Sequence, residues 1–289
     1  MDRPGSRCLA VDMTKTPNTD VLVLGGSGKT GRRVTEALRR RGARPRPASR
    51  SGGHRFDWYD EETWEPALAG VEAVYLVDAQ SADAAERMRA FARLAVDGGA
   101  RRLVLLSSRD LWMIGDPALL TVEQAVQDSG AEWTLLRPSW FSQNFTEAWF
   151  MAEGIAAGEL RQPTGDGLDP FIDAEDIAEV AVAALLDDGH AGQAYELTGP
   201  RLLSFGDAVA EIARATGRDI GYVPVTEEEY AKEMARRGVA AEEIEQFIML
   251  FGRIRRGANA YLADGVQRAL GREPRDFADY AASIEVRGS

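Results

Sequence analysis

The 289-residue sequence is poor in the side chains that build disulfides and metal sites, with one cysteine and two histidines. Cys8 alone excludes a disulfide within the chain and is typical of a reducing compartment, so we expect a cytoplasmic protein. His54 and His190 are far from each other and from Cys8, so no metal-ligand cluster is indicated. The sequence therefore predicts a site that works without a bound metal.

Long apolar runs and an excess of positive charge are also missing. No apolar run approaches the ~20 residues of a membrane helix, and residues 1–18 lack a signal-peptide core, so we expect a loose leader and no membrane partner. The formal charge of −12 argues against a nucleic-acid surface, which needs clustered Lys and Arg. What remains is a soluble globular protein acting on a small molecule, with its oligomeric state open.

Glycines follow a short apolar run near the start of the chain. Residues 21–24 are typical of a strand buried on both faces, and residues 31–42, after the glycines, have the periodicity of an amphipathic helix. Glycines in the turn let a pyrophosphate approach the helix N-terminus, which predicts a dinucleotide site. A P-loop would need glycine where Val23 stands, and the remaining alternative is a glycine turn without a ligand. The expected cofactor contacts here are Gly25, Ser27, Gly28, Lys29, Thr30 and Gly31, with Lys29 at the phosphates.

Strand-like and helix-like segments alternate as far as residue 138. This rhythm predicts an α/β fold with a doubly wound parallel sheet (Rossmann), whose ligands bind at the carboxyl ends of the strands. Pro45 and Pro47 cannot donate to a neighbouring strand, so we expect the second strand to be short. The expected strands are 21–24, 43–50, 54–57, 72–79, 101–108 and 132–138, and the expected helices about 31–42, 61–70, 82–97 and 118–129.

The alternation loosens beyond about residue 140. We expect a leader at 1–18, an NAD(P)-binding Rossmann domain at 19–150, and a smaller mixed α/β C-terminal lobe at 151–289. The lobe is interleaved with the first domain and closes over the nucleotide. Within it, Ser204-x-x-Asp207 and Thr226-x-x-Glu229 have the spacing of helix capping boxes.

The end of the second strand indicates which dinucleotide binds. NADH is held there by an acidic residue, whereas the 2′-phosphate of NADPH requires an arginine. Arg50 stands at this place and no carboxylate follows until Asp57, so we expect NADPH. The further residues expected at the cofactor are Ser49, Asp57 and Trp58 at the adenosine, with Val77, Asp78 and Ser107 at the ends of later strands.

Aromatic residues cluster after the sixth strand, where the open end of the cofactor cleft should lie. Aromatic walls with one amide suit a flat, apolar substrate, although such rings also pack in protein cores. Ser107 is the candidate catalytic residue, although serines that end strands are also common turn formers. The expected substrate contacts are Trp112, Trp140, Phe141, Asn144 and Phe145.

Several segments in the same order resemble the atypical, NmrA-like branch of the short-chain dehydrogenase superfamily. They include VLGGSGKTG, FDWYDEETW, RLVLLSS, EWTLLRPSWFSQNF, TGDG and PFIDAEDIAEVA. The combination is most similar to the ergot-alkaloid reductase group, the agroclavine dehydrogenase and festuclavine synthase type, and its bacterial relatives. The resemblance implies a Rossmann domain, NADPH and hydride transfer. Because the branch also hosts NAD(P)-sensing regulators and quinone reductases, both remain alternatives.

The sequence departs from this superfamily in its proton donors. The superfamily usually has a Tyr-x-x-x-Lys pair, but no tyrosine stands four residues before Lys15, Lys29 or Lys232. Many relatives also carry Lys or His before a glutamate where this chain has Leu120 and Val122 before Glu123. Without a positioned acid, a ketone is a poor substrate because its reduction creates an alkoxide. We therefore expect hydride transfer to an iminium or a conjugated carbonyl.

Overall fold

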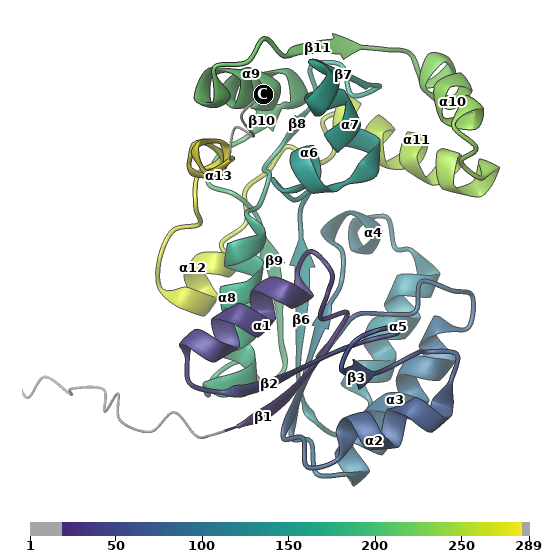
Figure 1. Cartoon of the computed structure of the whole chain (residues 1–289), viewed down its shortest axis with the longest axis vertical. Coiled ribbons are helices and arrows are strands. Elements are labelled where there is room, and N and C mark those ends of the chain that lie inside the picture. Colours follow the sequence, from purple (N-terminus) through teal and green to yellow (C-terminus); the bar gives the residue numbers. More distant parts are fainter. Residues whose placement is uncertain (1–18, 285–289) are drawn as a thin grey trace, which may run out of the picture.

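A parallel sheet of seven strands forms the centre of the computed structural model, which describes residues 19–284 (Figure 1). The expected leader and Cys8 lie outside the described residues. The strand order is β3-β2-β1-β4-β5-β6-β9, so the order reverses between β1 and β4 and opens a crevice at the carboxyl ends there. The doubly wound parallel sheet is confirmed. Its strands are β1 Asp20–Leu24, β2 Arg44–Ser49, β3 His54–Arg55, β4 Ala73–Leu76, β5 Arg102–Leu106, β6 Glu132–Pro138 and β9 Gln193–Leu197.

Helices cover both faces of this sheet (Figure 1). Because side chains alternate along a strand, Val21 and Val23 of β1 join one hydrophobic cluster while Leu22 and Leu24 join the other. All four are fully buried, which explains why β1 reads as a continuous apolar run. One face is covered by α1 Gly31–Arg40, α8 Ala174–Leu186 and α12 Gly265–Leu270, and the other by α2 Trp64–Leu68, α3 Ala84–Asp97 and α5 Pro117–Gln127.

Strand β2 is six residues long despite its two prolines, so the expectation of a short strand is wrong. Arg44 N and Ala48 O both bond toward β1, which means that Pro45 and Pro47 face the opposite side. On that side β3 pairs only with Ala48 and Ser49. The N–H groups that the two prolines lack would therefore point to a side where no neighbouring strand accepts a hydrogen bond at these positions.

The C-terminal lobe lies above the carboxyl ends of the large sheet in Figure 1 and has a core of its own. Two small sheets belong to it, β7 with β11 and β8 with β10. The capping boxes at Ser204 and Thr226 are both formed. The lobe consists of α6 Asn144–Glu147, α7 Trp149–Ala157, β7 Glu159–Gln162, β8 Leu168–Asp169, β10 Leu203–Ser204, α9 Phe205–Thr216, β11 Gly221–Pro224, α10 Glu227–Arg236, α11 Ala241–Arg255 and α13 Phe277–Ser283.

The chain passes more than once between the sheet and the lobe. Helix α8, strand β9 and helix α12 come from the C-terminal half but complete the Rossmann sheet and its helical cover. Two short elements, η1 Glu61–Thr63 and α4 Arg109–Met113, complete the described chain. None of the helices in residues 19–284 is long and apolar enough to cross a membrane.

Candidate active site

The glycine turn between β1 and α1 is closely packed. Gly25 adopts φ +63°, a left-handed conformation that favours glycine. A Cβ on Gly31 would lie 2.2 Å from the Gly25 carbonyl oxygen, and one on Gly26 would lie 2.5 Å from Pro47 Cβ. The absence of side chains therefore brings the start of α1 against the end of β1.

The outer side of this turn is open. Ser27 and Gly28 are exposed, and the N-cap of α1, Thr30, makes no side-chain capping bond. Gly28 N donates to Gly25 O at 2.8 Å, which holds the turn in shape. Arg32 N, in the first turn of α1, donates to Gly28 O at 3.1 Å. The exposed turn in front of the helix N-terminus fits a pyrophosphate.

At the adenosine end, Arg50 is exposed just beyond β2 and makes no ion pair with any residue between 19 and 284. Ser49 ends the strand beside it. The Asp57 carboxylate accepts a hydrogen bond from Tyr59 N at 3.0 Å. Trp58 is buried and donates from Nε1 to Val77 O at 3.2 Å, so its ring supports the core beneath the cleft.

Two residues after β4 flank the turn. Val77 packs behind Gly25, where an added Cβ would meet Val77 Cγ2 at 3.1 Å. Asp78 follows it, and burial raises the pKa of the Asp78 carboxyl. The structure thus brings the β4 end and the glycine turn together as one wall of the crevice.

A cavity of about 230 Å³ lies where β5 and β6 end. Residues that follow β5 and β6 form its floor, with α4 at one side, while α6 and Leu250 of α11 close it from the lobe. Apolar walls with a few polar groups are typical of a small-molecule site. We call it the reduction pocket, and its lining is Ser107, Ser108, Asp110, Leu111, Pro138, Ser139, Trp140, Phe141, Asn144 and Leu250.

The Ser107 hydroxyl is held by a buried carboxylate. Ser107 Oγ donates to Glu123 Oε1 at 2.5 Å, and Arg137 holds both oxygens of Glu123 at 2.9 and 2.5 Å. Glu123 is only 3% exposed, so this bond is made without competition from bulk water. With its proton directed at Glu123, Ser107 presents lone pairs to the pocket and acts there as an acceptor.

Trp140 is held in place by residues on both sides of the boundary between the Rossmann domain and the C-terminal lobe. Its Nε1 donates to Asp110 Oδ2 at 2.7 Å, and its ring stacks on Phe251 with centroids 5.0 Å apart. Its position at the boundary between the lobes makes it a wall of the reduction pocket with little rotational freedom.

Behind Trp140 lies a buried group of two carboxyls, one guanidinium and one amide. Asn259 Nδ2 donates to Asp110 Oδ2 at 3.1 Å and to Asp169 Oδ2 at 2.9 Å. Arg109, fully buried, lies 3.6 Å from each carboxyl. Burial and the neighbouring Asp110 raise the pKa of Asp169 to about 8.

The Lys29 side chain reaches from the turn to α6. Its Nζ donates to Asn144 Oδ1 and lies 5.7 Å from the centroid of the Phe141 ring. Both partners line the reduction pocket. The expectation for the Lys29 side chain was the phosphates, but in the structure it bridges to α6.

Two expected substrate contacts lie elsewhere. Phe145 is 0% exposed and packs with Phe171 in the core of the lobe. Trp112, on α4, has the Arg137 guanidinium 4.3 Å from its ring centroid and is outside the pocket lining. Sequence reasoning missed Leu250 and Asp110, since nothing in the local pattern of either indicates the pocket.

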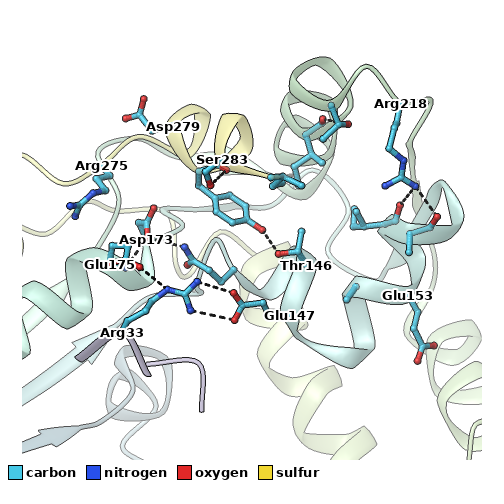
Figure 2. Close-up of a pocket in the computed structure, with 18 residues that line it drawn as sticks. Arg33, Thr146, Glu147, Glu153, Asp173, Glu175, Arg218, Arg275, Asp279 and Ser283 are labelled. Atoms are coloured by element: carbon cyan, nitrogen blue, oxygen red, sulfur yellow. Dashed lines mark hydrogen bonds and ion pairs between the residues drawn. The ribbon is translucent and has the colours of Figure 1, made fainter. Parts of the chain in front are cut away.

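A second, larger cavity of about 1130 Å³ lies on the other side of α6 (Figure 2). Arg33 projects into it between Glu147 and Glu175, and Tyr280 bonds to Thr146 at 2.8 Å. This cavity is lined by residues of α1, α6, α7, α8, α9 and α13, and its lining contains none of the glycine-turn residues and none of the residues that end β1, β4, β5 or β6. The reduction pocket, though smaller, is the one at the carboxyl ends of the strands, where ligands bind in this architecture.

Comparison with known proteins places the glycine turn in a wider group. A family model described as NAD(P)H-binding matches residues 25–188. The uncharacterized oxidoreductase YesF of Bacillus subtilis (strain 168) is 35% identical over 271 residues, covering 91% of this chain and 94% of that protein. Agroclavine dehydrogenase of Claviceps fusiformis is 33% identical over 281 residues, covering 91% and 96%. The resemblance seen in the motifs is confirmed.

Solved structures share the architecture. The NADPH-dependent quinone oxidoreductase QOR2 of Escherichia coli, crystallised with NADPH, has a TM-score of 0.73 to this chain at 19% identity, covering 91% of this chain and 99% of that one. At this identity the likeness concerns the fold.

Proposed function

Since the chain belongs to the NAD(P)H-binding family of oxidoreductases, we propose that it uses NADPH to reduce a small, flat, apolar substrate that is either an iminium ion or a conjugated carbonyl compound. The observation that carries the proposal is the reduction pocket, an aromatic-walled site whose serine hydroxyl is directed at a buried glutamate.

The glycine turn and Arg50 support NADPH as the cofactor. The exposed glycine turn before α1 suits the pyrophosphate, and an exposed arginine without an acidic partner in the described chain suits the 2′-phosphate. A charge-assisted hydrogen bond contributes about 1.5 to 3 kcal/mol, which corresponds to roughly 10- to 100-fold in affinity. We therefore expect Arg50 to give the protein a preference for NADPH over NADH.

The bond between Ser107 and Glu123 supports an electrophile that needs no acid from the protein. Bound NADPH supplies hydride from C4 of its nicotinamide ring. In an iminium ion, hydride addition to carbon moves the π electrons onto nitrogen and neutralises its charge. In a conjugated carbonyl, the electrons move to oxygen, and the enolate then takes a proton from water. Neither reaction requires Ser107 to release its proton.

The protein's contribution is then positioning. Trp140 and Phe141 hold a flat substrate against the cofactor face, and Asn144 offers one amide to orient it. Holding the reacting carbons about 3 to 3.5 Å apart supplies a large share of the rate enhancement without any proton transfer.

Cofactor preference is tested by titrating NADPH and NADH against the wild type and Arg50→Ala. We expect Arg50→Ala to weaken NADPH about tenfold or more and to leave NADH unchanged. Arg89→Ala, which removes an exposed arginine of α3, is the matched control. Equal affinity of the wild type for both dinucleotides would contradict the assignment.

The chemistry is tested with panels of iminium, enone and quinone substrates. We expect Ser107→Ala to retain the rate within about tenfold and Phe141→Ala to raise KM markedly, because the ring positions substrate. A loss of ~10³-fold in Ser107→Ala with NADPH binding intact would reveal a dedicated acid. Absence of NADPH turnover with all panels would favour the sensor alternative.

A further inference from the structure

We propose that Lys29 is a specificity-determining residue of the reduction pocket, selecting conjugated carbonyl compounds, quinones included, over iminium cations. The inference rests on the proposed function and narrows its two substrate classes to one. Its basis is the placement of the only lysine in the described cleft, on the pocket side of the glycine turn.

Lys29 is anchored to the pocket by two of its lining residues. Asn144 Oδ1 accepts one ammonium proton, and the Phe141 ring lies beneath the charge with its centroid 5.7 Å from Nζ. Two N–H bonds of the ammonium group remain for a further acceptor. The backbone of Lys29 stays in the turn, where N–H groups can still hold the phosphates. Its side chain lies just outside the pocket lining and contacts two residues of that lining.

The carboxylates beside the pocket are compensated within the described chain. Glu123 pairs with Arg137 at 2.5 Å, and Asp110 lies 3.6 Å from Arg109. No carboxylate lies within 4 Å of Lys29 Nζ in residues 19–284. The Lys29 ammonium is therefore a positive charge beside the pocket without an ion-pair partner among residues 19–284, and Arg253, whose charge acts on Asp110, is a second.

The surroundings of Lys29 lower its pKa but leave it above neutral pH. Burial lowers its pKa to about 8, Glu147 opposes this shift, and Arg33 and Arg32 add to it. Glu147 is itself occupied by Arg32 at 2.6 Å and by Arg33 at 2.8 Å. Below about pH 8 the ammonium form predominates.

This charge affects the two candidate reactions in opposite directions. Hydride addition to the β-carbon of an enone moves the C=C electrons toward the carbonyl oxygen, and the ammonium stabilises the enolate that forms. An iminium ion brings a positive charge into the same field and is repelled before reaction. A conjugated carbonyl is thus favoured both in binding and in the transition state.

The test compares Lys29→Met, which removes the charge, with Lys29→Arg, which keeps it. Lys232→Met, on the exposed face of α10, is the control for lysine loss. We expect Lys29→Met to lower kcat/KM for an enone at least tenfold, to leave or raise that for an iminium, and to change the NADPH Kd less than threefold. Lys29→Arg should restore the enone rate. The wild-type enone rate should decline above about pH 8, where Lys29 loses its proton, and Lys29→Arg should not show this decline.

A readout without turnover separates this inference from the proposed function. In the NADP⁺-loaded protein, binding of a planar phenolate, an enolate mimic, should weaken about tenfold in Lys29→Met, while binding of a planar quinolinium cation should not. If the protein turns over no substrate but the phenolate result holds, the proposed function fails and the role of Lys29 stands. An unchanged phenolate affinity in Lys29→Met would overturn the role of Lys29 in the pocket. A parallel loss of NADPH affinity and of both activities would overturn it too and would identify Lys29 as a phosphate ligand.

Discussion

Replacing Asp169 by asparagine should make the protein's stability less dependent on pH. Asp169 is fully buried, and it shares one guanidinium, that of Arg109, with Asp110. Its pKa is raised from 3.8 to about 8, first by burial and then by the charge of Asp110. In the unfolded chain the proton is lost near 3.8, whereas the folded protein keeps it until about 8.

The sign of the effect follows from proton counting. Between these two pKa values the folded state binds more protons, so its stability falls as pH rises, by at most about 1.4 kcal/mol per pH unit. Above pH 8 both states are ionised and this contribution no longer changes. The amide introduced by Asp169→Asn does not titrate, and its oxygen can still accept the 2.9 Å bond from Asn259. From pH 5 to pH 7 the advantage of Asp169→Asn over the wild type should therefore grow by about 2 to 3 kcal/mol.

Urea unfolding followed by tryptophan fluorescence at pH 5, 6, 7 and 8 measures this difference. The matched control is Asp166→Asn, which changes an exposed carboxylate in the turn before β8. Its difference in unfolding free energy from the wild type should be the same at every pH. A stability difference between Asp169→Asn and the wild type that stays constant from pH 5 to 8 would show that Asp169 is ionised in the folded protein and refute the reasoning.

Two further substitutions test the turn and the buried pair. Gly31→Ala should lower the unfolding free energy by about 1 to 3 kcal/mol and weaken NADPH binding at least tenfold, since its Cβ would lie 2.2 Å from the backbone oxygen of Gly25. Calorimetric titration with NADPH measures the change in binding. The control is Gly53→Ala, whose Cβ would have no described atom within 4 Å. Glu123→Gln should lower the unfolding free energy by about 3 to 5 kcal/mol because it leaves the nearly buried Arg137 without its counter-ion. A loss below about 1 kcal/mol would argue against a stabilising ion pair between Glu123 and Arg137.

Local patterns in the sequence determined the framework of this protein. The glycine spacing at 25, 28 and 31, the apolar run of β1 and the capping boxes at Ser204 and Thr226 each act within a few residues of themselves. Such signals predict elements and the order in which they alternate, and the doubly wound sheet follows from that order. The same patterns indicated which strand ends would line the cleft.

Burial and partners far along the chain were decided only by the tertiary structure. Phe141 and Phe145 are four residues apart in one aromatic stretch, yet one lines the pocket and the other is sealed in the core of the lobe. Lys29 meets Asn144 across 115 residues, and Asp110 meets Asn259 across 149. Periodicity cannot encode such contacts, because they depend on how the lobe packs over the strand ends. The sheet thus follows from patterns within short stretches of sequence, whereas the charge and shape of its pocket depend on contacts between residues far apart in the chain.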